Sequence, residues 1–549
     1  MAVSSKNALY RPVGSYEGRR GRVKRVVLLY GGGLDTSTMI PWIKEVYRAE
    51  VIALTLDLGQ LTGDLDTVRK RALKLGADKA LLIDARQEFV DEYISRSIKA
   101  NGNYQGQYYL STALARPLLV AWAVKIADRE GADAIAHGAS GKGNDQVRLD
   151  GSIQALNPDL KIIAPAREWG LSKSEQLQYC RLKKVPVKEI NEGIFVYDDN
   201  MWGITTEGGE IQNAELIPPL KDILHVCRLP EEAHSRPDYL TLSFQRGLPV
   251  AIDDTKFNLL DIITSLNKRA ALAGVGITYS LEDRIIGVKT RGVYEGPAAS
   301  TIITAHIALE RYAFTRQQNE FKALVDQKWA YLCYGGLWHE PLMTDLNAYL
   351  NQANDVLSGQ VTLKLYRGNV EVVAVALSSG VFVDRRKTFM ENDNRLNMAA
   401  SVGFIEHYSL QMSLAQRRQP TAFISIGGRN QKLKLLTYVK MLDEAGYRLY
   451  ATYKTHKFLK KHGIEATLVH KLSNPELKPN IADLIETARF DLIINIPTSS
   501  DSTAIRSKEK AANEFVHEKA VSLNIPLISS LPQAAKNIAR LTKQEGGAQ

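Results

Sequence analysis

The sequence predicts an α/β protein with a parallel-sheet nucleotide-binding domain, an α+β domain and a second α/β domain. Three observations predict this fold class. A buried strand and a glycine-rich turn stand near the start, strand and helix signals alternate over residues 26–136, and a second alternation fills residues 421–529. Such alternation is typical of parallel sheets, which bind ligands at the carboxyl ends of their strands.

The glycine-rich turn is the most informative stretch. Val26–Leu29 form an apolar run typical of a buried strand, Gly31, Gly32 and Gly33 follow, and Asp35–Thr38 can open a helix. Glycines let a ligand approach the backbone, and the N–H groups of a helix start favour phosphate. The spacing matches neither a Walker A loop nor a dinucleotide fingerprint. A turn that serves only chain geometry stays an alternative.

The other elements follow in chain order. The first domain is expected to hold strands at 51–56, 80–83 and 134–136 and helices at 67–75 and 110–130. In the middle region, residues 259–273 and 302–332 have helical composition, and residues 361–365 and 370–375 predict a hairpin. The last region predicts strands at 422–426, 448–452, 492–495 and 526–529, with helices at 432–445 and 508–523.

Composition changes along the chain set the expected domain boundaries. We expect a basic tail at 1–22, a nucleotide-binding domain at 23–190, and a substrate and oligomerisation domain at 191–395. A helix and linker at 396–420 then lead to a last domain at 421–549. About 130 residues suffice for such a separate domain.

Bulk properties restrict the class of protein. The 549 residues are 45% hydrophobic and 24% charged, with no apolar run as long as a membrane span and no secretory segment. The three cysteines lie far apart, which suits a reducing cytoplasm and excludes a disulfide framework or a cysteine-based zinc site. The net charge of +10 suits anionic substrates, and without a recognisable binding module the basic tail is not expected to bind nucleic acid.

Several separated motifs resemble one family. They are Gly-Gly-Leu-Asp-Thr-Ser at 32–37, Asp-Leu-Gly-Gln at 57–60, Thr-Ala-Leu-Ala-Arg-Pro at 112–117, His-Gly-Ala-Ser-Gly-Lys-Gly-Asn-Asp-Gln-Val-Arg at 137–148 and Arg-Gly-Val-Tyr-Glu at 291–295. Together they resemble argininosuccinate synthase over about residues 24–410. The resemblance implies a PP-loop, adenine-nucleotide α-hydrolase-like domain followed by a synthetase domain that usually supports a homotetramer.

The resemblance also implies the reaction. ATP, with Mg²⁺, would activate the ureido oxygen of citrulline and release pyrophosphate, and the amine of aspartate would attack the citrullyl-adenylate to give argininosuccinate and AMP. No histidine base is needed, so His137 is expected to serve through hydrogen bonds. Catalysis would rest on positioning and electrostatics, and no metal-ligating residue is assigned.

Site residues are carried over from the matching positions. By resemblance, ATP contacts Leu29, Tyr30, Gly31, Gly32, Gly33, Asp35, Thr36, Ser37, Leu56, His137 and Gly138. Arg116, Asn144 and Asp145 match catalytic positions. The amino-acid substrates would be held by Tyr108, Thr112, Arg116, Ser140, Asn144, Asp145, Arg148, Thr205, Glu207, Glu282 and Tyr294.

Three departures from the family pattern leave alternatives open. Gly31 replaces a loop serine, and Ala113 and Val196 replace serines of the citrulline pocket. A lost hydrogen bond to a charged ligand costs about 1.5–3 kcal/mol, or roughly 10- to 100-fold in a binding step. A paralogous ligase with another ureido or amino-acid substrate is therefore one alternative, and a catalytically weakened nucleotide or metabolite sensor is another.

Residues 421–545 resemble a second family, the methylglyoxal-synthase-like domain that ends carbamoyl-phosphate synthetases. The segments 448–459, 478–485 and 491–497 carry this resemblance. It implies an allosteric effector bound in a phosphate-accepting pocket, without lyase activity. Lys454 stands where the family has glycine. The expected effector residues are Thr452, Lys454, Thr455, Asn495, Thr498 and Ser499.

Overall fold

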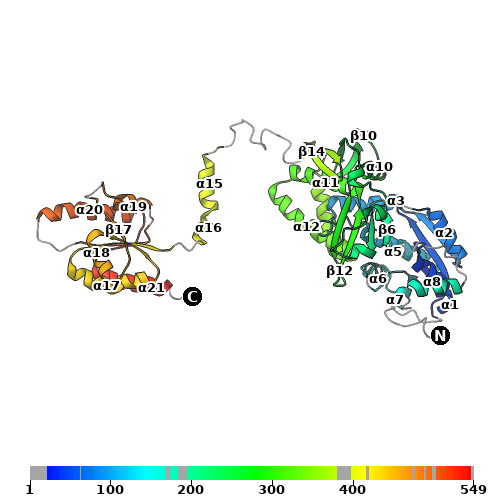
Figure 1. Cartoon of the computed structure of the whole chain (residues 1–549), viewed down its shortest axis with the longest axis horizontal. Coiled ribbons are helices and arrows are strands. Elements are labelled where there is room, and N and C mark those ends of the chain that lie inside the picture. Colours follow the sequence, from blue (N-terminus) through cyan, green and yellow to red (C-terminus); the bar gives the residue numbers. More distant parts are fainter. Residues whose placement is uncertain are drawn as a thin grey trace. The chain divides into compact units, whose positions relative to one another are not determined.

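The computed structural model describes residues 22–61, 63–141, 143–168, 173–183, 195–379, 397, 399–415, 419–472, 476–487, 490–497 and 503–545. The chain divides into two compact units, residues 1–393 and residues 394–549, which are described separately (Figure 1). Residues 1–21 of the predicted basic tail lie outside the described residues. In the described part of the chain, no helix combines the length and apolar character needed to cross a membrane.

The first unit begins with the predicted parallel sheet. Its order is β3-β2-β1-β4-β5, and all neighbouring pairs are parallel. The order reverses beside β1, so the carboxyl ends of β1 and β4 form the switch point where open α/β sheets bind ligands. The strands are β1 Arg25–Leu29, β2 Glu50–Asp57, β3 Lys79–Asp84, β4 Ala134–Ala136 and β5 Lys161–Ile163.

Both faces of this sheet are covered, because alternate residues of β1 point into different cores. Val26 and Leu28 join a cluster with α1, whereas Val27 and Leu29 join a larger cluster that includes α5 and continues through the rest of the unit. The helices are α1 Leu34–Val46, α2 Leu65–Lys74, α3 Arg86–Phe89, the π-helix η1 Val90–Ile94, α4 Ser95–Lys99, α5 Ser111–Glu130, α6 Asp145–Leu156, α7 Pro165–Glu168 and α8 Lys173–Leu182.

Two antiparallel sheets complete the first unit. One has the order β11-β12-β7-β6 and the other β10-β9-β8-β13-β14. The strands are β6 Phe195–Asn200, β7 Gly203–Gly208, β8 Asp238–Gln245, β9 Leu248–Ile252, β10 Thr255–Lys256, β11 Ile277–Asp283, β12 Lys289–Glu295, β13 Gly359–Tyr366 and β14 Asn369–Leu377. The helices are the 3-10 turns η2 Gly209–Gln212 and η3 Pro230–Glu232, with α9 Leu220–Ile223, α10 Leu259–Leu272, α11 Pro297–Ala313, α12 Arg316–Tyr334 and α13 Pro341–Asn354.

One predicted element of this region is confirmed and one is wrong. The hairpin forms between β13 and β14, and Arg367 and Gly368 both take positive φ in its two-residue turn. The single helix expected over residues 302–332 is instead two helices, α11 and α12. Thr315 ends the first run because its side chain and that of Gln318 form a capping box that starts α12.

The second unit contains another parallel sheet, of order β17-β16-β15-β18-β19. Helices α17 and α21 cover one face, and α19 and α20 cover the other. The strands are β15 Thr421–Ile426, β16 Arg448–Thr452, β17 Thr467–Val469, β18 Leu492–Ile496 and β19 Leu527–Ile528. The helices are α15 Ala400–Tyr408, α16 Leu410–Ala415, α17 Arg429–Glu444, α18 Tyr453–Lys461, α19 Ile481–Thr487, α20 Thr503–Ser522 and α21 Leu531–Glu545.

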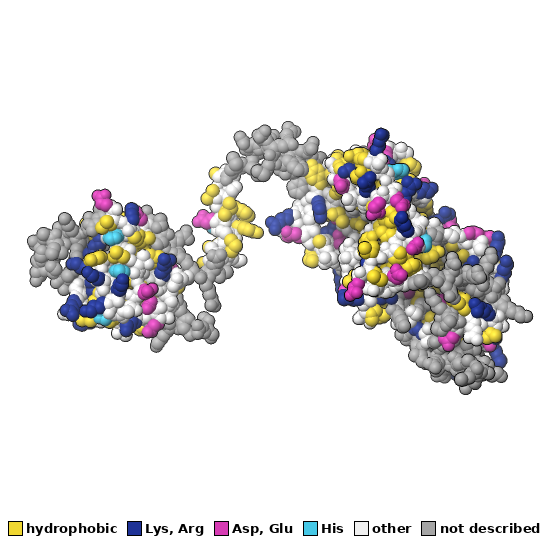
Figure 2. Space-filling view, viewed as in Figure 1, with side chains coloured by type: hydrophobic (Ala, Val, Ile, Leu, Met, Phe, Trp, Pro, Cys, Tyr) yellow, Lys and Arg dark blue, Asp and Glu magenta, His cyan; other side chains and the backbone are white. Residues whose placement is uncertain are grey.

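Helices α15 and α16 precede this sheet and expose apolar side chains (Figure 2). Val402, Phe404 and Tyr408 of α15 and Met412 and Leu414 of α16 are all exposed. Apolar surface of this extent is characteristic of an interaction surface.

Candidate active site

The glycine-rich turn joins β1 to α1 at the switch point. A Cβ atom at Gly31 or Gly33 would meet nothing within 4 Å, whereas at Gly32, with φ +77°, it would lie 2.8 Å from Val68 Cγ1. Gly33 is the N-cap of α1 and supplies no side-chain cap to the helix N–H groups. The turn therefore offers open space in front of an uncapped helix start, which suits an anionic group.

The loop after β4 lies against this turn. A Cβ atom at Gly138 would come within 3.2 Å of Thr36 Cγ2, so the two loops approach closely because Gly138 has no side chain. His137 is 1% exposed, its Nε2 lies 2.6 Å from Asp150 Oδ1, and its Nδ1 accepts the Ala139 N–H. These bonds fix the loop, which is the hydrogen-bonding use expected of His137.

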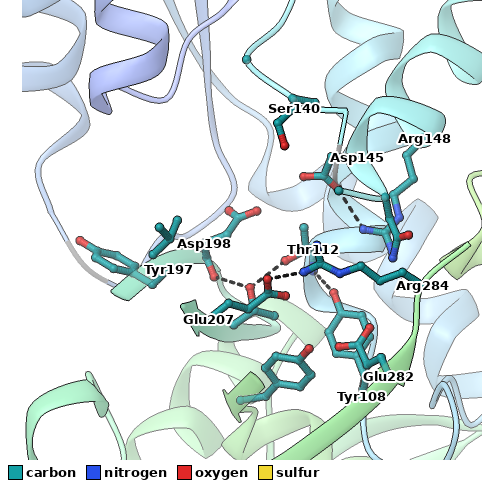
Figure 3. A pocket seen from close by; sticks show the side chains of 17 residues that line it. Tyr108, Thr112, Ser140, Asp145, Arg148, Tyr197, Asp198, Glu207, Glu282 and Arg284 are labelled. Atoms are coloured by element: carbon teal, nitrogen blue, oxygen red, sulfur yellow. Dashed lines mark hydrogen bonds and ion pairs between the residues drawn. The ribbon is translucent and has the colours of Figure 1, made fainter. Parts of the chain in front are cut away.

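A cavity of about 320 Å³ opens beside the loop after β4 (Figure 3). Its walls come from the start of α5, the start of α6 and the sheet that contains β6, β7, β11 and β12. Ten predicted substrate residues line it: Tyr108, Thr112, Ser140, Asn144, Asp145, Arg148, Thr205, Glu207, Glu282 and Tyr294. The structure thus gathers positions that are up to 186 residues apart in the sequence.

Asp145 is held between two arginines at the start of α6. Its Oδ2 accepts from Arg116 Nη2 at 2.8 Å, and its Oδ1 accepts from Arg148 Nη1 at 2.9 Å. Burial opposes ionisation of Asp145, but the charges of Arg116 and Arg148 outweigh it and lower the pKa of this carboxyl. Asp145 is therefore a fixed anion. Arg116 also donates to Asp198, which is absent from the predicted set.

One nitrogen of the Arg148 guanidinium group is available to a ligand. Its Nε donates to the Tyr334 carbonyl at 2.8 Å, while its buried Nη2 has no hydrogen-bond partner among the described residues. The side chain is only 5% exposed, and the residue lines the cavity. An orphaned guanidinium nitrogen in this setting suits a carboxylate.

Tyr108 caps α5 with its hydroxyl. The Tyr108 oxygen accepts the Thr112 N–H at 2.9 Å and the Ala113 N–H at 3.3 Å, and burial raises its pKa to about 12. The oxygen is therefore occupied as an acceptor, and its own proton is available to donate. Ala113 is 1% exposed and does not line the cavity, whereas Val196 does. Of the two residues that replace serines of the citrulline pocket, only Val196 lines the cavity.

Two glutamates on the facing sheet differ in their pairing. Glu282 is 4% exposed and accepts from the Tyr334 hydroxyl at 2.6 Å, and burial raises its pKa. Glu207 instead accepts from Arg284, a cavity residue that was not predicted. Arg284 stands two residues after Glu282 at the end of β11, and this proximity was the available sequence signal.

The predicted ATP residues lie at the switch point, and only Gly138 among them also lines the cavity. The side chains of Leu29, Tyr30, Ser37 and Leu56 are buried, so only their backbone could reach a nucleotide without rearrangement. Within the described ranges, no group of three or more histidine, cysteine or acidic residues is placed to hold a metal ion.

The C-terminal unit places its predicted effector residues at the carboxyl ends of β16 and β18. Thr452 Oγ1 lies 3.3 Å from Thr455 Oγ1 at the start of α18, and Asn495 is 8% exposed. Two further lysines, Lys432 and Lys471, are absent from the predicted set. They lie close enough to interact electrostatically with each other, and Lys432 also interacts electrostatically with Lys454. Thr498 and Ser499 lie outside the described residues.

Comparison with known proteins identifies the same regions. Residues 25–186 match the family described as "Arginosuccinate synthase N-terminal HUP domain", and residues 195–415 match the "Arginosuccinate synthase C-terminal domain". Residues 434–529 match the "MGS-like domain" family. The predicted fold class, with its PP-loop, synthetase and methylglyoxal-synthase-like domains, is confirmed.

Full-length relatives support this assignment. The argininosuccinate synthase of Pyrococcus furiosus is 41% identical over 391 residues, which cover 71% of this chain and 94% of the relative. Those of Alkaliphilus metalliredigens and Carboxydothermus hydrogenoformans are 41% and 40% identical, over 94% and 98% of their lengths. The chain therefore belongs to the argininosuccinate synthase family of ligases and carries a methylglyoxal-synthase-like domain in its C-terminal unit.

Proposed function

We propose that the protein condenses citrulline and aspartate to argininosuccinate through a citrullyl-adenylate, using ATP and releasing AMP and pyrophosphate. The observation that carries this proposal is the cavity, which gathers ten predicted substrate residues beside the loop after β4. That loop contacts the uncapped start of α1 through Gly138 and Thr36. An amino-acid site thus adjoins a site suited to phosphate.

The charges of the cavity suit a zwitterionic acceptor. Arg148 Nη2 lacks a hydrogen-bond partner among the described residues, so it is the group we assign to the citrulline carboxylate. Glu282 would hold the α-ammonium group, since its carboxyl is buried in the cavity wall and accepts a hydrogen bond from the Tyr334 hydroxyl. Glu207 would contribute less, because Arg284 already pairs with it.

Aspartate would be positioned by the start of α6. Asn144 Oδ1 accepts the Ile285 N–H at 3.0 Å, which ties the loop to the facing sheet. Ser140 and Asp145 would then contact aspartate, with Asp145 accepting a hydrogen bond from its ammonium group. Because Arg116 and Arg148 keep Asp145 ionised, we assign it no role as a general base.

The nucleotide would lie over the turn at 31–37, with its phosphates at the start of α1. ATP would supply the adenylyl group that makes the ureido oxygen a leaving group. The described residues offer no ready metal cluster, so any Mg²⁺ would be bound chiefly by phosphate oxygens, and we derive no step through it. The protein's own contribution is to orient the substrates and to neutralise their charge.

We also propose that the C-terminal domain binds an anionic effector that modulates the ligase. Thr452, Asn495 and Lys432 would contact its phosphate, with Thr455 positioning Thr452 through a hydrogen bond, and the place of Thr452 and Asn495 at the carboxyl ends of β16 and β18 supports this assignment. A homotetramer, a cytoplasmic location and the absence of nucleic-acid binding stay predictions from the sequence.

A pyrophosphate-release assay tests the ligase proposal. Full-length protein is incubated with ATP and Mg²⁺, and citrulline and aspartate are added singly and together. Release that requires both amino acids supports the proposal, and identifying argininosuccinate by mass spectrometry completes it. Absence of release despite measurable ATP binding would overturn it in favour of a sensor.

One observation favours a second candidate, a ligase for a related acceptor. Val196 is 57% exposed and lines the cavity where a serine is expected, so an apolar group replaces a hydroxyl at the acceptor site. Other ureido and guanidino compounds should replace citrulline in the same assay. A higher kcat/KM for one of them than for citrulline would establish this candidate.

A further inference from the structure

Tyr334 is the last residue of α12 and was not predicted from the sequence as a site residue. It is 0% exposed and does not line the cavity. Two of its groups nevertheless bond to the residues that we assign to the acceptor amino acid. The Tyr334 hydroxyl donates to Glu282 Oε2 at 2.6 Å, and the Tyr334 carbonyl accepts from Arg148 Nε at 2.8 Å. One buried residue therefore joins the groups assigned to the ammonium and the carboxylate of citrulline.

The ring of Tyr334 packs against the same part of the cavity wall. It stacks on Tyr104, with ring centroids 3.6 Å apart and 7° between the planes, and it meets Tyr108 edge-on at 6.2 Å. Arg148 Cζ lies 4.9 Å from the centroid of the Tyr334 ring, within the range of a cation–π interaction. Because Tyr108 and Arg148 line the cavity, the ring supports two wall residues from behind.

The chain after Tyr334 approaches α6 closely. Gly336 has φ +76°, and a Cβ atom there would lie 2.7 Å from Arg148 Cα. A Cβ atom at Gly151 would lie 3.8 Å from the Gly336 carbonyl oxygen. A side chain at Gly336 would force the two segments apart, so the glycine allows the end of α12 to pack on α6. The place of Tyr334 beside Arg148 is thus set by the backbone.

We propose that Tyr334 is a positioning residue, which holds Glu282 and Arg148 in place as the two charged ends of one α-amino-acid subsite. The proposal rests on the citrulline-binding role proposed for the cavity. Figure 3 shows Glu282 and Arg148 on the same side of the cavity, where they come from β11 and α6. These two elements are far apart in the chain, and Tyr334 bonds to both.

The hydroxyl bond also affects the charge state of Glu282. Burial raises the pKa of Glu282, and a neighbouring glutamate raises it too, whereas the Tyr334 hydroxyl and two arginines lower it. Removing the hydroxyl should raise this pKa further, so protonation and loss of ammonium binding should begin at a higher pH. The titratable and charged groups that face Glu282 are Tyr104, Tyr108, Arg148, Glu207, Arg284 and Tyr334.

Steady-state pyrophosphate release by the full-length protein tests the proposal with Tyr334→Phe. This variant keeps the ring and the carbonyl but loses the donor to Glu282. KM for citrulline should rise about tenfold at neutral pH, with kcat and KM for ATP within about threefold of wild type. The increase should shrink as the pH rises. The matched control is Tyr331→Phe on the same helix, which is 44% exposed and should change no constant by more than about twofold.

A double variant separates positioning from general damage to the fold. In a Glu282→Gln background, Tyr334→Phe should raise KM for citrulline by less than about twofold, because the hydroxyl has no carboxylate left to hold. The full increase in that background, a fall in kcat with an unchanged pH profile, or no change at all would overturn the proposal. A wild type that releases no pyrophosphate in response to citrulline would instead overturn the proposed function, and this proposal with it.

Tyr104 provides a second test that leaves Tyr334 unchanged and stands even if Tyr334→Phe fails to fold. Tyr104→Leu removes the stacked ring, whereas Tyr104→Phe keeps it and loses only the bond from the Tyr104 hydroxyl to the Asp283 carbonyl. Tyr104→Leu should raise KM for citrulline about threefold more than Tyr104→Phe does. Equal KM values in the two variants, with folding confirmed by circular dichroism, would overturn the positioning role of the ring.

Discussion

Charged groups are arranged in opposite ways in the cavity of the first unit and in the lysine cluster of the second, which comprises Lys432, Lys454 and Lys471. In the cavity, Arg116 and Arg148 pair with Asp145, and Arg284 pairs with Glu207. In the lysine cluster, three cations meet without a carboxylate partner for Lys432 among the described residues. Paired charges hold side chains in place before a substrate arrives, which suits catalysis. Like charges held close together destabilise the empty site, so binding of an anion stabilises it, which suits a sensor.

The largest effect is expected from breaking the arginine pairing in the cavity. Arg116→Gln leaves Asp145 and Asp198 facing each other without their shared cation. Removing one partner of a buried ion pair costs about 3–5 kcal/mol, and we expect kcat/KM to fall by more than about 100-fold. Urea unfolding and pyrophosphate release measure the two effects.

Arg129→Gln is the matched control for Arg116→Gln. Arg129 pairs with Glu130 at the surface and is 57% exposed, so its loss should change the free energy of unfolding by less than about 1 kcal/mol. Equal effects of the two substitutions would show that the cavity pairing has no special role.

Glu282 tests whether the cavity holds an ammonium group. Glu282→Gln should raise KM for citrulline about 10- to 100-fold, with a smaller change in KM for ATP. Because burial raises the pKa of Glu282, wild-type KM for citrulline should also rise as the pH falls toward that pKa, whereas the variant should show no such rise. A pH-independent wild-type KM would contradict the assignment.

A third charge cluster lies in the synthetase region, and there two carboxyl groups share one ammonium group. Lys322 is 2% exposed, and its Nζ lies 2.7 Å from both Asp326 Oδ1 and Glu310 Oε1. Burial and the neighbouring charge of Glu310 raise the pKa of Asp326 to about 7, although the charge of Lys322 opposes this shift. The unfolded value is about 3.9, so between about pH 4 and pH 7 the folded protein binds more protons.

The free energy of unfolding should therefore fall as the pH rises from 4 to 7 through this cluster. Asp326→Asn, which mimics the protonated form, should remove that contribution. Chemical denaturation at a series of pH values measures it, with Asp345→Asn on the exposed face of α13 as the control. A wild-type slope no different from that of Asp326→Asn would show that Asp326 does not titrate in this range.

The sequence predicted the sheet elements and the cavity residues to different extents. The strands around residues 26–136 could be located from apolar runs, because parallel strands are buried on both faces. The break at Thr315 was missed because helical composition continues across it, and only the Thr315–Gln318 side-chain bonds end the run.

The site residues that were missed have distant partners, and only Arg284, two residues after Glu282, had a local sequence signal. Arg284, Lys432 and Lys471 act through partners more than 15 residues away in the chain, so their roles depend on how the sheets fold. The predicted residues came instead from motifs, which record a family's contacts directly. The motifs also placed Ala113 in the citrulline pocket, but Ala113 is buried and does not line the cavity.

The smallest expected effect tests the departure in the phosphate turn. Gly31 has no positive φ and open space around it, so a serine fits there without strain. Gly31→Ser should lower KM for ATP about three- to tenfold by restoring a donor and should leave the free energy of unfolding unchanged within about 0.5 kcal/mol.

Gly32→Ser is the contrasting control, because φ is +77° there and a Cβ would strike Val68. If both serines weaken ATP binding, the turn admits no side chain. If Gly31→Ser changes nothing, the backbone N–H groups already satisfy the phosphates, and the missing hydroxyl does not separate this chain from its relatives.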